Sequence, residues 1–294
     1  LSSSSAASDV YKRQDWDYNM VEADREMFEE VFHGEDYCPD QVKIYPFQVM
    51  DWTELKNQHE QGLHHSYGTI NPGDDPEQNE LIKLLIEVKT KIPPYVRINR
   101  LKRDIPDSYS FDGIEESHGR QYIQRLIKKR GLRCRCIRCN QAETITDVNS
   151  CFIKILKYKA SHGQEYFIYF TNDKEEVIGF IRLRLSQNAG YYLRYKKNSM
   201  EVMKKSLIFP EIKNCAMIRE LHVYGETIGV EHTKKNQVTC QHVGFGSKRV
   251  QKAIEISKQN DFNKISVIAG EGVKKYYIDK FGFQTKNNFL VKEI

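Results

Sequence analysis

The chain has 294 residues, which is enough for about two domains. Its hydrophobic content of 39%, with 11% aromatic residues, is typical of globular proteins, and the lack of any 18-residue apolar run excludes a membrane-spanning helix. The formal net charge of +5 is unevenly distributed, because residues 91–140 hold 13 Lys or Arg against 5 Asp or Glu. This local excess favours a polyanionic partner, with a solvated basic face as the alternative.

The N-terminal residues and the cysteines indicate the cellular compartment of the protein. Residues 1–14 are Ser-rich and lack the apolar core of a secretory signal, so we interpret them as a disordered or non-native tail. There are seven cysteines, an odd number, and three of them lie within six residues. This pattern is typical of an intracellular protein with metal-binding or reactive thiols, so we expect a cytoplasmic location and no membrane partner.

Residues 15–106 mix strands and a helix. Residues 40–49 form a candidate buried strand, 77–92 an amphipathic helix that two prolines end, and 95–106 an alternating strand. Strand, helix, strand is an α/β pattern, and about 90 residues are too few for a whole barrel. The next segment, 107–140, is polar and basic, with one predicted helix, HGRQYIQRLIKKRG, before LRCRCIRCN.

From residue 141 onward the pattern predicts a sheet with interspersed helices. Residues 165–185 are typical of a β-hairpin, and 215–225 and 264–270 are typical of two further strands with a helix between them. A short helix over 274–283 and a last strand, NFLVKEI, complete the order.

The helix between these strands follows the stretch CQHVGFGSKR. Val250, Ala253 and Ile254 give it an apolar face, and Gly244 and Gly246 lie at its start. The start of a helix carries unpaired N–H groups and the positive end of the helix dipole, and glycines let a ligand approach the backbone, so a phosphate can bind there. Taken alone, the two glycines favour an ordinary helix-entry turn.

The order of these elements, with Gln-x-x-Gly-x-Gly after a strand, resembles the GNAT acetyltransferase fold. The resemblance implies a mixed sheet flanked by helices, in which backbone N–H groups of the loop and helix bind the pyrophosphate of acetyl-CoA. It also implies that Lys248 and Arg249 lie close enough to add positive charge. The cofactor-binding residues implied in this way are Gln241, Val243, Gly244, Phe245, Gly246 and Ser247.

Longer motifs narrow the resemblance. RELHVYG, QHVGFG and KKYYIDKFGF together resemble the catalytic-subunit family of Elongator, the tRNA uridine carboxymethyltransferases. PDQVKIYP and PPYVRINRLKRDIP resemble the closing part of that family's radical SAM domain, so the resemblance covers roughly residues 36–294. It implies an α/β chain with three parts: the C-terminal part of a radical SAM partial TIM-like barrel (15–106), a basic zinc-binding linker (107–140) and a GNAT domain (141–294).

The family's radical SAM domain also carries a cysteine triad for an iron–sulfur cluster, and this sequence contains no match to that triad. We therefore expect the chain to begin after the triad, as the C-terminal portion of a longer enzyme. For that enzyme the resemblance implies acetyl-CoA, S-adenosylmethionine, a [4Fe–4S] cluster and zinc as cofactors. It implies tRNA and other Elongator subunits as partners.

Two pairs of residues are candidates for proton transfer. Tyr276 and Tyr277 match paired tyrosines of the family, which implies that one hydroxyl acts as a general acid at the thioester sulfur. Because neighbours on a helix lie about 100° apart, at most one is expected to face the thioester, and core packing is the alternative. Glu220 and His222 share a face of a predicted strand, where either a general base or a structural hydrogen-bonding role fits.

The stretch CRCIRC places Cys134, Cys136 and Cys139 in a C-x-C-x2-C cluster. Thiolates so close together favour zinc, with reduced free thiols as the alternative. The resemblance supports zinc, because bacterial and archaeal members of the family carry a comparable motif between their two domains. A tetrahedral site needs a fourth ligand, for which His118 and Cys38 are both candidates.

Basic residues upstream of this motif lead to a hypothesis for tRNA binding. Arg97, Arg100, Lys102 and Arg103, with Lys43, are candidates to line the surface that receives tRNA. Each of them fits equally well as a surface charge or a salt-bridge partner.

The whole pattern predicts an acetyl-CoA-dependent acyltransferase that takes part in carboxymethylation of tRNA at C5 of the wobble uridine. Without the cluster cysteines, the chain is expected to bind acetyl-CoA and tRNA but not to complete the reaction. A protein lysine acetyltransferase of the histone type, and a non-catalytic module that binds acetyl-CoA or tRNA, are the alternatives.

Overall fold

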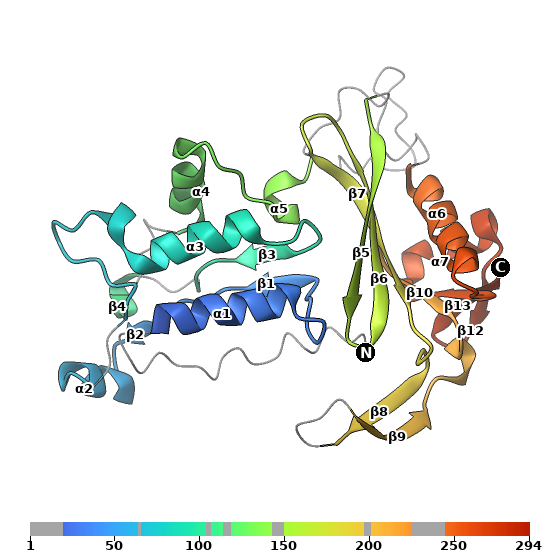
Figure 1. Cartoon of the computed structure of the whole chain (residues 1–294), viewed down its shortest axis with the longest axis horizontal. Helices are drawn as coiled ribbons and strands as arrows, with labels where there is room; N and C mark the ends of the chain where they lie inside the picture. The colour runs from blue at the N-terminus through green and yellow to red at the C-terminus, as the bar shows by residue number, and fades with distance from the viewer. Residues whose placement is uncertain are drawn as a thin grey trace. The chain divides into compact units, whose positions relative to one another are not determined.

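The computed structural model describes most of the chain, in two compact units. The first extends to Asn140 and the second runs from Gln141 to Ile294 (Figure 1). None of the described helices has both the length and the apolar character needed to cross a bilayer. The described residues are 20–63, 66–103, 107–113, 119–142, 150–196, 201–224 and 245–294.

The first unit is built around a parallel strand pair and the helix that connects it. β1 (Gln41–Lys43) pairs in parallel with β3 (Arg97–Arg100), and α3 (Glu80–Lys91) lies between them in sequence, as predicted. The side chain of Asn79 accepts hydrogen bonds from two N–H groups of the first turn of α3 and so stabilises its start. α3 ends just before two prolines and buries the apolar face that its periodicity predicts.

Two features of this unit differ from the sequence pattern. α1 (Met20–His33), which was not predicted, packs against α3. The strand predicted over 40–49 is divided into β1 and β2 (Gln48–Met50), because Pro46 between them has no N–H to offer to a strand ladder. β2 pairs with β4 (Ser110–Gly113) in a separate antiparallel pair.

The rest of the first unit consists of short helices. The predicted basic helix is present and is followed by Gly131, whose φ of +65° is left-handed and therefore suits glycine. These helices are α2 (Glu54–Glu60), α4 (Arg120–Lys129), α5 (Ile137–Asn140) and two 3-10 helices (Pro76–Gln78 and Asp107–Tyr109).

The second unit contains a seven-stranded mixed sheet in the order β12-β13-β11-β10-β7-β6-β5 (Figure 1). β6 and β7 form the predicted antiparallel hairpin, and β10 and β11 form the parallel pair that a helical connection permits. The strands are β5 (Phe152–Ala160), β6 (Gly163–Thr171), β7 (Val177–Leu185), β10 (Ala216–Val223), β11 (Lys264–Val267), β12 (Gln284–Lys286) and β13 (Phe289–Glu293).

Two helices cover one face of this sheet. α6 (Phe245–Gln259) and α7 (Glu271–Phe281) pack on it, and the core between them includes Ile218 of the sheet and Val250 of α6. α7 ends at Gly282, whose φ of +71° gives the left-handed cap typical of glycine. The mixed sheet flanked by helices is the arrangement that the GNAT resemblance implies.

Several strands of the second unit were not predicted. β5 is an edge strand, and its three lysines are typical of an edge that resists pairing with other chains. β8 (Tyr191–Tyr195) and β9 (Val202–Leu207) form a two-stranded ribbon outside the large sheet.

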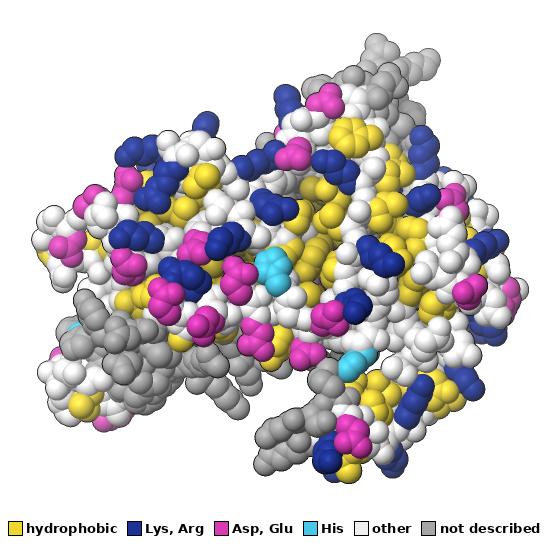
Figure 2. Space-filling model, in the orientation of Figure 1, with side chains coloured by type: hydrophobic (Ala, Val, Ile, Leu, Met, Phe, Trp, Pro, Cys, Tyr) yellow, Lys and Arg dark blue, Asp and Glu magenta, His cyan; other side chains and the backbone are white. Residues whose placement is uncertain are grey.

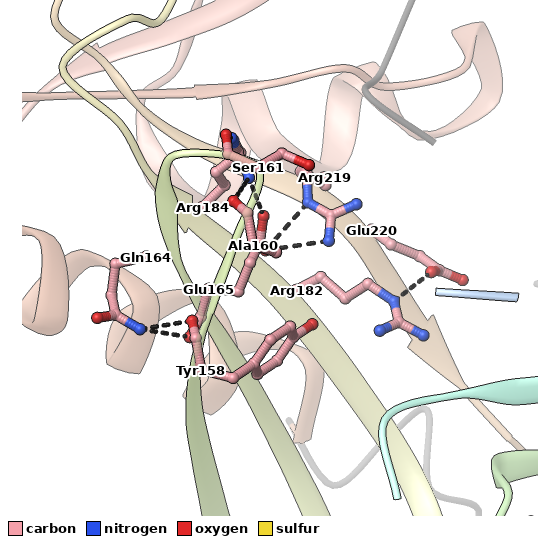
Figure 3. A network of polar contacts seen from close by, with 9 residues as sticks. All are labelled: Tyr158, Ala160, Ser161, Gln164, Glu165, Arg182, Arg184, Arg219 and Glu220. Atoms are coloured by element: carbon pink, nitrogen blue, oxygen red, sulfur yellow. Dashed lines mark hydrogen bonds and ion pairs between the residues drawn. The ribbon is translucent and has the colours of Figure 1, made fainter. Parts of the chain in front are cut away.

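A buried ion cluster joins β6, β7 and β10 (Figure 3). The carboxylate of Glu165, 2% exposed, accepts hydrogen bonds from Arg184 at 2.7 Å and from Arg219 at 3.0 and 3.1 Å. Arg184 also donates to the carbonyls of Ala160 and Ser161 at the turn between β5 and β6. Because both carboxylate oxygens are bonded to guanidinium groups, the cost of burying the charge is offset.

Candidate functional site

The sheet of the second unit opens between β10 and β11. Parallel pairing joins residues 216–218 of β10 to 265–267 of β11, and β10 then continues to Val223 whereas β11 ends. The side of residues 219–223 that faces β11 therefore lies beyond the described pairing. An extended chain with amide groups can hydrogen-bond to such an open strand edge.

The start of α6 lies next to the hydroxyl of Tyr276 on α7. The Ser247 Oγ is 3.5 Å from the hydroxyl oxygen of Tyr276, and a Cβ added at Gly246 would lie 3.0 Å from the same oxygen. Tyr276 is half-buried and packs edge-on against Phe281, with ring centroids 5.4 Å apart. A phenolic hydroxyl, the first N–H groups of a helix and a position without a side chain thus meet at one point.

Tyr277 has a different environment from its neighbour. It is 4% exposed and packs edge-on against Phe283, with ring centroids 5.7 Å apart. Burial raises the pKa of the Tyr277 hydroxyl well above its ordinary value, because the charged phenolate would lose its hydration. Tyr277 is therefore a neutral core residue, and Tyr276 is the tyrosine at the start of α6.

The expected phosphate loop is described in part. Gln241, Val243 and Gly244 lie outside the described residues, whereas Phe245 begins α6 and is followed by Gly246 and Ser247.

The two basic residues at the start of α6 differ from each other. Lys248 is exposed, but Arg249 is completely buried, with its guanidinium carbon 5.5 Å from the ring centroid of Phe170. A Cβ at Gly179 of β7 would clash with that guanidinium. Arg249 thus points into the sheet rather than toward a phosphate, in contrast to the expectation from sequence.

Glu220 and His222 on β10 have separate partners. Glu220 accepts a hydrogen bond from the Nε of Arg182 at 2.9 Å (Figure 3). His222 is exposed and stacks on Phe180, with ring centroids 5.7 Å apart, and its ring lies tilted against that of Tyr224, with centroids 4.4 Å apart. The ion pair of Glu220 with Arg182 agrees with the structural hydrogen-bonding role, which was the alternative to a general base.

The three clustered cysteines of the first unit converge. The sulfurs of Cys134, Cys136 and Cys139 all lie within 4.8 Å of one another. The side chain of Asn140 shapes this turn by donating to the carbonyls of Cys134 and Cys136, at 2.8 Å each. Sulfur ligands of a tetrahedral zinc ion lie roughly 3.8 Å apart, so the three side chains fit such an ion.

Positive charge lies beside these sulfurs. The Nζ of Lys89, a completely buried residue of α3, is 3.6 Å from the Cys139 sulfur, and a guanidinium nitrogen of Arg120 is 4.0 Å from it. The hydrogen bond between the thiols of Cys134 and Cys136 lowers the pKa of Cys136 and raises the pKa of Cys134, because Cys134 then keeps the shared proton. The nearby cations suit the thiolate form that metal ions require.

The candidates for a fourth ligand differ in what the structure shows. Cys38 directs its thiol to the carbonyl oxygen of Gly34, at 3.3 Å, and it is not a member of the cysteine group. His118 lies outside the described residues.

The proposed tRNA-binding residues lie on and just after β3. Arg100 and Arg103 are exposed, and Arg97 and Lys102 are half-buried. The guanidinium carbon of Arg103 lies 5.6 Å from the ring centroid of Tyr45.

Part of the basic segment serves the first unit itself. Arg120 donates to the carbonyl of Ile98 at 2.7 Å, Arg138 donates to the carbonyl of Asn99, and Lys129 pairs with Glu77. The local charge excess therefore overstates the number of cations available to an external polyanion.

The neighbours of the cysteine sulfurs were missed in the sequence. Lys89 lies within a predicted helix, 50 positions before Cys139 in the sequence, and Arg120 is the first residue of α4. No sequence spacing connects Lys89 and Arg120 to the cysteine motif. Only the tertiary structure shows that these two side chains lie beside the sulfur of Cys139.

Comparison with known proteins first defines the class. Residues 39–129 match the family model of the radical SAM C-terminal domain. The chain also superimposes on a solved structure of archaeal Methanocaldococcus infernus Elp3 with an N-terminal deletion, with a TM-score of 0.72 and 30% identity, over 93% of this chain and 60% of that chain. The predicted α/β fold class is confirmed, with a radical SAM C-terminal domain in the first unit and a mixed sheet with helices in the second.

Curated relatives show which enzymes the chain is similar to. The chain is 31% identical to the tRNA uridine(34) acetyltransferase of Methanocaldococcus infernus, over 93% of this chain and 48% of the relative. It is 29% identical to Elongator complex protein 3 of Saccharomyces cerevisiae and of Homo sapiens, over 46% of each relative. The chain is a homologue of these enzymes, as the Elongator resemblance predicted, and it spans about half the length of the curated relatives it matches.

Proposed function

We propose that this chain is the acyl-CoA-binding and tRNA-binding portion of an enzyme that modifies tRNA at the wobble uridine. The observation that carries the proposal is the meeting of Gly246, Ser247 and the Tyr276 hydroxyl at the start of α6, beside the opening between β10 and β11. Homology to tRNA uridine(34) acetyltransferases supports the same reading.

In this proposal the pyrophosphate of acetyl-CoA binds the first N–H groups of α6 and the preceding loop, including Gln241, Val243 and Gly244. The helix dipole and the absence of a side chain at Gly246 both favour an anion there. The amides of the pantetheine arm pair with the open edge of β10 at residues 219–223. These contacts direct the thioester toward Tyr276.

Tyr276 then acts as the general acid. In the hydrolysis reaction, water attacks the thioester carbonyl, the C–S bond breaks, and the acetyl group is released as acetate. The thiolate of coenzyme A would take the proton of the phenolic hydroxyl, which prevents the reverse attack. Tyr277, buried in the core, supports α7 and takes no part in proton transfer.

We propose that Cys134, Cys136 and Cys139 hold a zinc ion as thiolates, with Lys89 and Arg120 offsetting part of their charge. The ion would fix the end of the first unit and has no chemical step of its own. Arg97, Arg100, Lys102 and Arg103 are the proposed tRNA-binding residues.

In the full-length enzyme, S-adenosylmethionine and a [4Fe–4S] cluster would supply the radical chemistry that yields the carboxymethyl product at C5 of the uridine. Other Elongator subunits are the expected protein partners, and the cytoplasm is the expected location.

The proposal is tested by the stimulation of acetyl-CoA hydrolysis. We expect unmodified tRNA transcript to accelerate release of free coenzyme A, measured with a thiol reagent, and a lysine-containing histone peptide to have no effect. Acceleration by the peptide alone would support the lysine acetyltransferase. Binding of acetyl-CoA without hydrolysis under any condition would support the non-catalytic module.

A further inference from the structure

The β8–β9 ribbon carries a concentration of positive charge. Its strands, YYLRY and VMKKSL, contain three cations and no acid. Figure 2 shows dark blue side chains among yellow ones over this ribbon. The ribbon is outside the large sheet and is not part of the acyl-CoA site described above (Figure 1).

One face of the ribbon is defined by its register. Tyr192 lies opposite Ser206, and Arg194 lies opposite Lys204. Because side chains alternate along a strand, these four residues share one face, which we call the ribbon face. Tyr192 is 54% exposed, and Arg194 and Lys204 are exposed as well.

The ribbon face places like charges directly opposite each other. A guanidinium and an ammonium group across a strand pair repel, and such pairs destabilise a sheet. The acid in the described part of the ribbon turn, Glu201, is paired with Lys196 at 3.5 Å. An anion between Arg194 and Lys204 would turn this repulsion into two charge-assisted contacts.

The aromatic side chains differ between the two faces. On the reverse face, the Nζ of Lys205 lies 4.1 Å from the ring centroid of Tyr191, and Tyr195 stacks on His162 with centroids 5.1 Å apart. Tyr192, two positions from Arg194, presents more than half of its surface to solvent. An exposed ring beside two cations is the combination with which proteins bind single-stranded nucleic acid, by stacking on bases and contacting phosphates.

We propose that the ribbon face is a second tRNA contact, in which Arg194 and Lys204 hold a backbone phosphate and Tyr192 stacks on an unpaired base. This inference rests on the proposed function, since it takes tRNA as the substrate. It adds a contact on the acyltransferase unit to those proposed at β3. The partner is an unpaired segment, because bases inside a helix are not available to the Tyr192 ring.

The test uses two neighbouring lysines as a matched pair. Lys204→Gln and Lys205→Gln remove the same charge from adjacent exposed positions on opposite faces of β9. Dissociation constants for an unmodified tRNA transcript are measured by fluorescence anisotropy at several salt concentrations. We expect Lys204→Gln to weaken binding about tenfold and to reduce the slope of log K against log salt by about 1, and Lys205→Gln to change affinity less than about threefold.

A charge reversal separates binding from folding. Arg194→Glu creates an opposite-charge pair with Lys204, so we expect a higher melting temperature together with weaker tRNA binding. Tyr192→Ala should weaken binding of a single-stranded RNA oligonucleotide about tenfold, whereas Tyr192→Phe should retain it.

The outcomes distinguish the ribbon face from the function on which it rests. If Arg194→Glu and Lys204→Gln both bind tRNA as tightly as the parent protein, the ribbon face is not a tRNA contact. An acidic protein partner would then be the alternative occupant. Equal losses of tRNA affinity in Lys204→Gln and Lys205→Gln also contradict the proposal, because unspecific electrostatic attraction would then account for the binding. A parent protein that binds acetyl-CoA but no tRNA at any salt concentration overturns the proposed function itself.

Discussion

Tyr276 and Tyr277 are adjacent and chemically alike, but their environments assign them different roles. The Tyr276 hydroxyl lies 3.5 Å from the Ser247 Oγ, at the start of α6, whereas Tyr277 is 4% exposed among phenylalanines. Neighbours on a helix point about 100° apart, so the two side chains face different surroundings. Arg249 is a similar case, because its position in the first turn of α6 suggests phosphate binding but its side chain is buried against the sheet.

We expect Tyr276→Phe to lower the tRNA-stimulated rate of acetyl-CoA hydrolysis by about a hundredfold or more, since it removes the proton donor. The affinity for acetyl-CoA should stay near that of the parent. Tyr277→Phe is the matched control and should keep the rate, because the ring remains in the core. Steady-state release of coenzyme A gives the comparison, and a greater loss in Tyr277→Phe would reverse the two roles.

Glu165 offers a prediction on stability. Glu165→Ala leaves the largely buried Arg184 and Arg219 without their carboxylate, so we expect the free energy of unfolding to fall by about 3–5 kcal/mol. Glu255→Ala removes an exposed partner of Lys252 and should cost less than about 1 kcal/mol. Urea unfolding followed by circular dichroism measures both, and similar small losses would mean that the cluster does not hold the three strands together.

At the scale of elements, the candidate site depends on how β10, β11, α6 and α7 end. β10 continues beyond its described pairing with β11, and Gly246, the second residue of α6, lies beside the hydroxyl of Tyr276. Neither helix nor strand is unusual by itself. In the proposed function, their ends receive a phosphate, an extended arm and a reacting group in succession.

Gly246→Glu tests the start of α6. A carboxylate there repels the pyrophosphate and fills the space beside Tyr276, so we expect acetyl-CoA affinity to fall more than about tenfold. Gly272→Glu near the start of α7 is the control, because a Cβ there meets no atom within 4 Å. Isothermal titration calorimetry measures both affinities, and equal affinities in two folded variants would contradict the phosphate site.

The cysteine motif around α5 gives a prediction on metal content. We expect about one zinc ion per chain in the parent protein and almost none in Cys136→Ser, measured by elemental analysis after dialysis. Cys215→Ser, at a buried cysteine of the second unit, should keep the metal. Parent protein purified with zinc in the medium but free of metal would show that the cluster consists of reduced thiols.

At the scale of the whole molecule, the chain joins two units with different tasks. The unit up to Asn140 carries the cysteine cluster and the residues of β3, and the unit from Gln141 onward carries the proposed acyl-CoA site and the ribbon. Each unit has its own sheet pairings. This division predicts that the acyl-CoA site does not depend on the first unit.

A protein of residues 141–294 alone should therefore fold and bind acetyl-CoA within about threefold of the full chain, since the proposed contacts all lie in that unit. It should bind tRNA more weakly, because the cations of β3 are gone. Calorimetry with acetyl-CoA and anisotropy with tRNA provide the two measurements. A folded second unit without affinity for acetyl-CoA would show that the site needs residues of the first.

The sequence by itself determined the order of most elements, the homology to Elongator catalytic subunits and the positions of the cysteine and glycine motifs, because these depend on local periodicity and on residues near one another in the chain. It missed α1, β5 and the β8–β9 ribbon. Only the tertiary structure decided which tyrosine reaches α6, that Arg249 is buried, and that Lys89 lies beside Cys139. The reason is physical: the direction of a side chain and its distant neighbours follow from how elements pack, and packing joins residues that no local pattern connects.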